Sequence, residues 1–104
     1  IVIISPGVPP LDMVQLLRTA EATETLVIGP NSPGIIVPGK ILLGTQPSEF
    51  YTPGSVAILS RSTTLTYEIA RELTQAGIGQ SISVSIGSDA IVGSSFMQWL
   101  QILD

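Results

Sequence analysis

Short apolar runs alternate along the chain with stretches in which apolar residues recur every three or four positions. The runs Ile1–Ile4 and Val56–Leu59 predict strands buried within a sheet, and Thr25–Ile28 predicts a further strand. The spacing typical of a helix covers about Leu11–Ala22 and then Leu65–Ala76. Because a helical crossover joins parallel strands, this order predicts an α/β fold built from parallel β-α-β units. The stripes expected to face the sheet are Met13, Leu16, Leu17 and Ala20 in the first helix and Leu65, Ile69, Leu73 and Ala76 in the second.

The same patterns predict further elements. Ile35–Val37 and Ile41–Leu43 flank Pro38-Gly39, which is typical of two short strands around a tight turn. Serines alternate with apolar residues over Ser81–Ile86, which indicates a strand with one buried side. The residues expected in a final helix are Ser94 or Ser95 as its cap, Phe96, Leu100 and Leu103 on its apolar face, and Met97 and Trp99 in core packing.

The chain changes character near Pro53. All eight prolines lie at or before that residue, and Gly44–Gly54 shows no periodicity. We interpret Gly44–Gly54 as a linker and predict two pieces of domains, residues 1–53 and residues 54–104. The chain opens without Met and directly in an apolar run, so we expect it to be an excerpt of a longer polypeptide.

The most informative stretch is Ser60–Thr64, where the predicted strand becomes a helix. The first turn of a helix has unpartnered amides and a partial positive charge, so it attracts anions. No Glu or Gln lies three residues after these hydroxyl residues to complete a capping box, and the first acid, Glu68, follows the first turn. The turn is therefore open to a phosphate or carboxylate. The alternative is ordinary capping by Ser62 or Thr63.

Composition narrows the chemistry. Only 12% of the 104 residues are charged while 44% are hydrophobic, so we expect a partner subunit or the rest of the chain to cover much of the surface. The net charge of −4 is scattered, which argues against a nucleic-acid partner. The short apolar runs argue against a membrane span. The absence of cysteine and histidine excludes a Ser-His-Asp triad, a histidine base and most zinc sites within these residues.

Several motifs together resemble the α subunit of succinyl-CoA synthetase, and the match covers essentially the whole chain in one register. ATP-citrate lyase and the NDP-forming acyl-CoA synthetases have similar segments. The residues that carry the resemblance are Pro9–Met13, Ile28–Gly34, Pro38-Gly39, Pro53-Gly54, Ser60–Glu68, Gly79–Ser81 and Ile86–Asp89.

The resemblance implies an acid–CoA ligase that forms acyl-CoA from a small carboxylic acid, coenzyme A and ATP or GTP, through an acyl phosphate and a phosphohistidine. It implies the end of a Rossmann-like CoA-binding domain followed by the start of a flavodoxin-like ligase domain. The resemblance also implies that the nucleotide and Mg bind elsewhere in the full protein. That protein is expected to pair with a β subunit or a fused β region and to form an oligomer. Its expected location is the cytoplasm, or the mitochondrial matrix in a eukaryote. By position, the residues that match contacts to coenzyme A are Ile4, Ser5 and Pro6. The helix start that receives the phosphohistidine or the carboxylate is matched by Ser60, Ser62, Thr63 and Thr64. Tyr67 matches a substrate-side residue.

Some residues depart from this pattern. The family usually has glycine at Thr63, where a side chain narrows the space for a phosphate, and an acidic residue at Pro6, which also lacks an N–H donor. The family's active histidine and its β region are absent, so we expect the fragment alone to be inactive. The departures leave two alternatives open: a non-catalytic module that binds coenzyme A or an anion for sensing or assembly, and a structural fragment that serves pairing between subunits.

Overall fold

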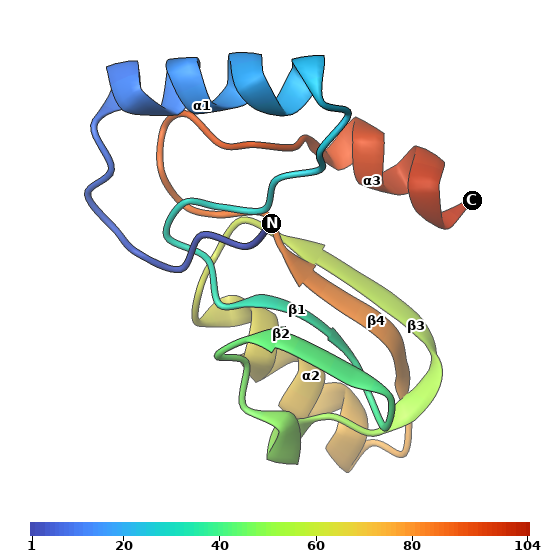
Figure 1. The fold of residues 1–104 in the computed structure, drawn as a ribbon. Helices are drawn as coiled ribbons and strands as arrows, with labels where there is room; N and C mark the ends of the chain where they lie inside the picture. Colours follow the sequence, from blue (N-terminus) through green and yellow to red (C-terminus); the bar gives the residue numbers. More distant parts are fainter.

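The structure is a computed structural model that describes residues 1–104, and it has the expected α/β class. A four-stranded sheet has the strand order β2-β1-β4-β3 (Figure 1). The elements in chain order are α1 (Pro10–Ala22), β1 (Gly34–Val37), β2 (Ile41–Gly44), the short 3-10 helix η1 (Ser48–Phe50), β3 (Pro53–Ser60), α2 (Leu65–Gln75), β4 (Gln80–Ser85) and α3 (Phe96–Leu103).

The sheet is mixed rather than wholly parallel. Strands β3 and β4 are parallel and α2 connects them, so the predicted second β-α-β unit is confirmed. The predicted hairpin is also confirmed, because β1 and β2 pair antiparallel around the turn at Pro38-Gly39. Strand β1 then pairs antiparallel with β4, a contact that the sequence pattern did not predict. The boundary expected near Pro53 stays a prediction; strands from both sides of that residue share this sheet.

The first β-α-β unit is reduced to a single parallel bridge between Val2 and Ile28. The amide of Ile3 donates to the carbonyl of Ile28 at 2.8 Å, and the amide of Ile28 donates to the carbonyl of Ile1 at 2.8 Å. Ile1 is 69% exposed and Ile4 is 49% exposed, so the prediction of a buried strand at Ile1–Ile4 is wrong. A strand is buried only where other elements cover it; Val2 packs partly buried against the cluster around Ile28, but Ile1 and Ile4 remain exposed.

Helix α2 faces the sheet with a different side from the one predicted. Thr66 and Ala70 are its buried residues, whereas Leu65 is 59% exposed and Ile69 is 45% exposed. The hydroxyl of Thr66 donates to the carbonyl of Ser62 at 2.6 Å, so this polar residue is buried without an unpaired group. Strand β3 is likewise less buried than expected: it is an edge strand, and Ile58 is its one buried residue.

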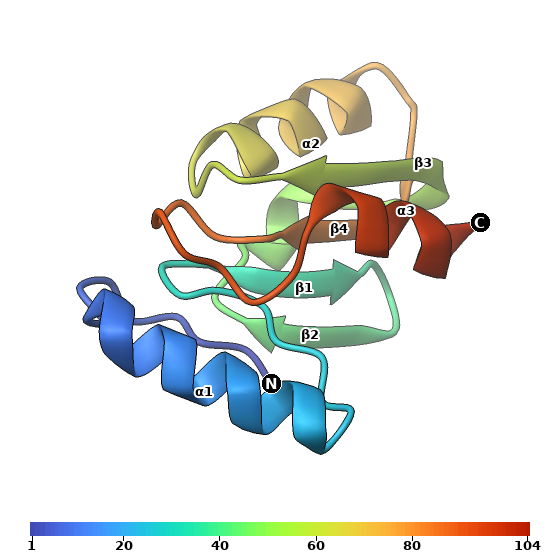
Figure 2. The ribbon, with the colours of Figure 1, turned by 90° about the horizontal axis from the view of Figure 1, so that it is seen from above.

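Two small hydrophobic clusters hold the fold together. One cluster joins Ile28, Val84 and Ile86 to Trp99 of α3. The other joins Ile36 of β1, Ile58 of β3 and Tyr51 to Ala70 of α2. Accordingly, α2 and α3 lie on opposite sides of the sheet, with α1 apart from it (Figure 2).

Two further segments differ from expectation. In α3, Trp99 is buried as predicted, but Met97 and the predicted apolar face at Phe96, Leu100 and Leu103 are exposed. The reason is that α3 packs against the rest of the chain mainly through Trp99. Gly44–Gly54 is not a free linker, since Gln46 and Tyr51 within it are buried. None of the helices combines the length and the apolarity needed to span a lipid bilayer.

Candidate functional site

Three loops meet at the carboxyl ends of the parallel strands, where ligands of α/β sheets usually bind. They are Gly29–Pro33, Ser60–Thr64 after β3, and Ile86–Asp89 after β4. The amide of Gly29 donates to the carbonyl of Ile86 at 2.8 Å, and the amide of Ile86 donates to the carbonyl of Ser60 at 2.7 Å. The backbone itself therefore joins the loops that the sequence pattern singled out.

A cavity of about 340 Å³ opens between the first two of these loops, the N-terminal segment, the start of α2 and the segment Thr45–Pro47. Of the predicted site residues it brings together Ile4, Thr63, Thr64 and Tyr67, but Ser5, Pro6, Ser60 and Ser62 do not line it. None of its lining residues carries a formal charge, so any attraction for an anion must come from amides, hydroxyls and the helix dipole. The remaining lining residues, which the sequence analysis did not assign to a site, are Asn31, Ser32, Pro33, Thr45 and Pro47.

The amides at the start of α2 are only partly capped. The Oγ atom of Ser62 accepts from the amide of Leu65 at 3.0 Å, and the Oγ atom of Ser60 accepts from the amide of Ser62 at 3.0 Å. The capping alternative is thus confirmed for Ser62, which takes one donor of the helix. The amides that have no hydrogen-bond partner within the chain are those of Thr63, Thr64, Thr66 and Tyr67. Two of these residues, Thr63 and Thr64, precede the helix and line the cavity.

Buried serines hold this turn in place. The carbonyl of Ser62 also accepts from the Oγ atom of Ser85 at 3.1 Å, and the Oγ atom of Ser32 donates to the carbonyl of Ser85. Ser83 and Ser85 are both fully buried, although the alternating pattern predicted that they face solvent. Their hydroxyls are hydrogen-bonded inside the chain, which removes the penalty of burying them. Alternation alone gave no signal of this, because it reports side-chain type and not the partners across the sheet.

A second buried polar group lies behind the cavity wall. Gln46 stands between the lining residues Thr45 and Pro47, and its Nε2 atom donates to the carbonyl of Gly34 at 2.7 Å and to that of Ser83 at 3.2 Å. The hydroxyl of Tyr51 donates to the Oε1 atom of Gln46. Burial raises the pKa of the Tyr51 hydroxyl, and its hydrogen bond with Ser83 lowers the pKa by less. Tyr51 therefore remains a protonated donor at neutral pH.

Aromatic contacts place the ring of Tyr67 at the cavity. Its centroid lies 5.9 Å from that of Phe50 in η1, with a 42° angle between the ring planes. The guanidinium carbon of Arg71, one turn after Tyr67 in α2, lies 5.7 Å from the Phe50 centroid. Such a tilted aromatic pair restricts the ring that faces the cavity.

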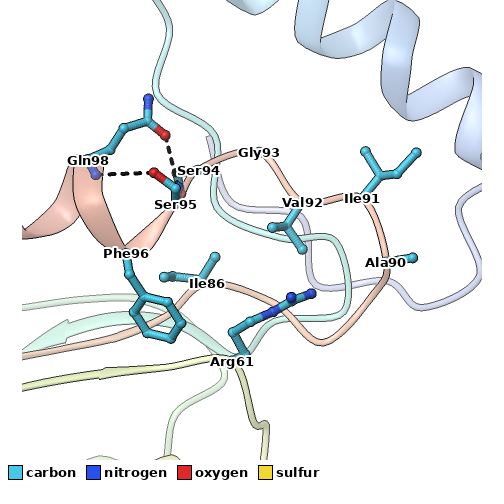
Figure 3. Close-up of a pocket in the computed structure, with 10 residues that line it drawn as sticks. All are labelled: Arg61, Ile86, Ala90, Ile91, Val92, Gly93, Ser94, Ser95, Phe96 and Gln98. Atoms are coloured by element: carbon cyan, nitrogen blue, oxygen red, sulfur yellow. Dashed lines mark hydrogen bonds between the residues drawn. The ribbon is translucent and has the colours of Figure 1, made fainter.

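A larger hollow of about 480 Å³ lies between Arg61 and the start of α3 (Figure 3). It contains none of the predicted site residues. The start of α3 is closed by a capping box: the Oγ atom of Ser95 accepts from the amide of Gln98 at 3.2 Å, and the amide of Ser95 donates to the Oε1 atom of Gln98 at 2.9 Å. This helix start therefore offers fewer free donors than the start of α2.

The whole chain is similar in sequence to α subunits of CoA ligases. The chain is 50% identical over 105 residues to succinate–CoA ligase [ADP-forming] subunit alpha 2 of Archaeoglobus fulgidus, covering 100% of the chain and 36% of that subunit. It is 46% identical over 101 residues to the corresponding α subunit of Methanothermobacter thermautotrophicus, covering 97% of the chain and 34% of that subunit. The chain is homologous to part of the succinate–CoA ligase α subunits. No family model matches it.

Homology to the ligase α subunits confirms the resemblance drawn from the motifs. The α subunit of malate–CoA ligase from Methylorubrum extorquens is also 46% identical over 105 residues, so this segment is shared by ligases named for different acids. The chain spans about a third of the length of these α subunits, with 36% of the first and 34% of the second covered.

Solved structures of related ligases share the fold. The dinucleotide-forming acetyl-coenzyme A synthetase 1 of Ca. Korarchaeum cryptofilum has a TM-score of 0.79 at 25% identity, over 97% of this chain and 22% of that one. ATP citrate lyase from Methanothrix soehngenii, solved in complex with citrate and coenzyme A, has a TM-score of 0.81 at 27% identity, over 93% of this chain and 17% of that one. The mixed α/β sheet is therefore the one found within these CoA ligases.

Proposed function

We propose that the chain forms part of an acid–CoA ligase, which joins a small carboxylic acid to coenzyme A at the expense of ATP or GTP through an acyl phosphate and a phosphohistidine. The observation that carries the proposal is the uncharged cavity at the start of α2, lined by Thr63 and Thr64 with free amides, in a chain 50% identical to a ligase α subunit. The nucleotide and its Mg bind elsewhere in the full protein. The β subunit or a fused β region completes the site in an oligomeric, cytoplasmic or mitochondrial enzyme.

The start of α2 would hold the phosphoryl group or the carboxylate. Fixed amides directed at a negative charge stabilise it without a protein base, and they need no reorganisation as the charge moves. The four free amides lie within the five residues Thr63–Tyr67, so they would act on one anion together. The chain contains no histidine, so the phosphorylated histidine would come from another part of the protein.

Coenzyme A would contact the exposed segment Ile4–Pro6. The residues present fit such a role: Ile4 lines the anion cavity and also an apolar hollow of about 410 Å³ beside β2. The apolar arm of the cofactor would cover Ile4, while Ser5 offers a hydroxyl and an amide. Pro6 offers no amide, so binding there depends on shape rather than on a backbone donor.

A non-catalytic module that binds coenzyme A or an anion is the second candidate. It is favoured by Thr63, whose side chain lines the cavity where the family usually has glycine. The two candidates differ in turnover and not in binding, so activity of the full-length protein separates them.

The first test assays the full-length protein with its β partner, Mg, ATP or GTP, coenzyme A and a panel of acids that includes succinate, malate, citrate and acetate. We expect acyl-CoA to form with at least one acid and labelled phosphate to appear on histidine. Binding of coenzyme A without either product would favour the non-catalytic module.

The second test places a competing charge at the helix start. In Thr64→Asp, the new carboxylate takes the free amides itself, and an acidic residue at this end stabilises the helix, so the fold is kept. We expect the KM for inorganic phosphate in the reverse reaction to rise by more than about tenfold, the equivalent of one charged hydrogen bond. Thr64→Asn is the matched control, because it caps equally well without charge. An equal KM in the two variants would refute anion binding at α2.

A further inference from the structure

We propose that Asn31 and Arg61 are positioning residues that fix two walls of the cavity, because each binds the loop Gly87–Asp89. This inference rests on the proposed ligase function, since it assigns residues that act through others at that same site. We refer to Asn31, Arg61, Ser88 and Asp89 as the clasp.

Asn31 joins its own loop to the loop Gly87–Asp89 and to the N-terminal segment at Ser5. Its Nδ2 atom donates to the Oγ atom of Ser88 at 2.7 Å and to the Oδ1 atom of Asp89 at 3.3 Å. Its backbone carbonyl accepts from the amide of Ser88 at 3.3 Å, and its own amide donates to the carbonyl of Ser5 at 3.0 Å. Asn31 has a positive φ of 56°, a conformation that asparagine and aspartate adopt more readily than other side chains.

The side chain of Arg61 binds the backbone of the same loop. Its Nε atom donates to the carbonyl of Gly87 at 3.1 Å, and a terminal nitrogen donates to the carbonyl of Asp89. Gly87 has a φ of +120°, and a Cβ atom there would collide with the carbonyl of Pro30. The loop is thus held tightly against the segment that carries Asn31, with no room for adjustment.

The clasp connects the two proposed binding segments. Arg61 lies two residues before Thr63, which lines the cavity, and Asn31 is bonded to Ser5 in the segment proposed to contact coenzyme A. A displacement of Gly87–Asp89 would therefore move both walls relative to each other. Asn31 lines the cavity itself, but both hydrogens of its Nδ2 atom already have acceptors, so its side chain positions the loops instead of donating to a ligand.

A reciprocal exchange tests the clasp in the full-length ligase with its partner region. In Asn31→Asp the two side-chain donors are lost and a second carboxylate faces Asp89. In the double variant Asn31→Asp with Asp89→Asn, residue 89 becomes the donor, the Ser88 hydroxyl can turn to donate, and both contacts return with reversed direction. Asp89→Asn alone controls for the lost charge, and Asp104→Asn, at an exposed position, controls for the same substitution elsewhere.

The readouts are the dissociation constant for coenzyme A, the KM for inorganic phosphate in the reverse reaction, and the thermal midpoint. We expect Asn31→Asp to raise both constants by about tenfold in the folded enzyme, and the double variant to restore them to within about threefold. A purely structural role would lower the midpoint and leave both constants of the folded enzyme unchanged, and that result would overturn the inference. So would a double variant as impaired as Asn31→Asp.

The two proposals can fail separately. If the wild-type protein shows no turnover but calorimetry with coenzyme A gives the same loss and rescue, the ligase function fails and the clasp is upheld. If turnover is present and the exchange gives no rescue, the ligase function stands and the clasp is refuted. A wild-type protein that binds neither coenzyme A nor inorganic phosphate would refute both.

Discussion

Replacing Gln46 by Leu should weaken the sheet beside the cavity more than any exposed substitution of the same type. Gln46 is 2% exposed and its side-chain amide serves three partners: the carbonyls of Gly34 and Ser83 and the hydroxyl of Tyr51. Leucine is close in size to glutamine, so the change removes these hydrogen bonds without leaving a large cavity. It isolates the polar contribution of the residue.

The expected loss follows from the partners left behind. The carbonyls of Gly34 and Ser83 would each lose a buried donor, and each such group costs about 1–3 kcal/mol when unsatisfied. Tyr51 retains a contact with the hydroxyl of Ser83 at 3.3 Å, so its loss is partial. Because these carbonyls belong to paired strands, the lower half of the range applies to each, and with the partial loss at Tyr51 we expect a total of about 3 kcal/mol.

Native-state hydrogen exchange of the full-length protein measures this loss locally. The free energy of opening for the amides of β1 and β4 should fall by about 3 kcal/mol in Gln46→Leu, while amides of α1 keep theirs. Gln75→Leu, at the exposed end of α2, is the matched control and should change opening by less than about 0.5 kcal/mol. Equal effects of the two substitutions, or a loss at β1 and β4 below about 1 kcal/mol, would refute the reasoning.

Three shorter predictions concern the same region. Burial raises the pKa of Tyr51, so the folded state is stabilised relative to the unfolded state while the Tyr51 hydroxyl stays protonated. This stabilisation is complete below the unfolded pKa of about 10 and is lost as pH rises through the folded pKa. The thermal midpoint should therefore fall more steeply above about pH 10 in the wild type than in Tyr51→Phe, and parallel curves would contradict this. Ser62→Ala should cost the first turn of α2 about 1 kcal/mol in hydrogen exchange, since the amide of Leu65 loses its cap, yet leave phosphate binding no weaker. Thr63→Gly should lower the KM for phosphate several-fold by widening the cavity, and an increase would contradict the steric argument.

Hydrophobic periodicity predicted most of the elements and their order, although Ile1–Ile4 and Thr25–Ile28 form only one bridge. The helix over Leu11–Ala22 is found as Pro10–Ala22, and the hairpin around Pro38-Gly39 and the β-α-β unit around α2 are both present. These features depend on local spacing and on turn chemistry, both of which a single sequence reports directly. The motifs also led to the ligase resemblance, which homology confirms.

Burial was predicted less well, because it depends on which elements meet. In α2 the apolar side chains of Leu65 and Ile69 are exposed while Thr66 is buried, and no pattern within the helix shows that Ser62 satisfies the Thr66 hydroxyl. The serines of β4 are a second example: Ser85 is buried because its partner lies 23 positions away in the turn before α2. Polar residues with distant partners are therefore the main source of error.

The same serines show how an uncharged cavity could hold the anion that we propose. Ser60 and Ser62 satisfy two amides of the turn, and Ser85 holds its carbonyl, so the turn is rigid although the donors of Thr63 and Thr64 stay free. Arg61 lies within the turn itself, but two of its donors are used on loop carbonyls. In the proposed function, attraction at the cavity would thus come from fixed amides and the start of a helix, and both act over short distances. A phosphoryl group, which arrives charged and leaves after transfer, would then be held only while it lies against those amides, as a shuttle between two reaction steps requires.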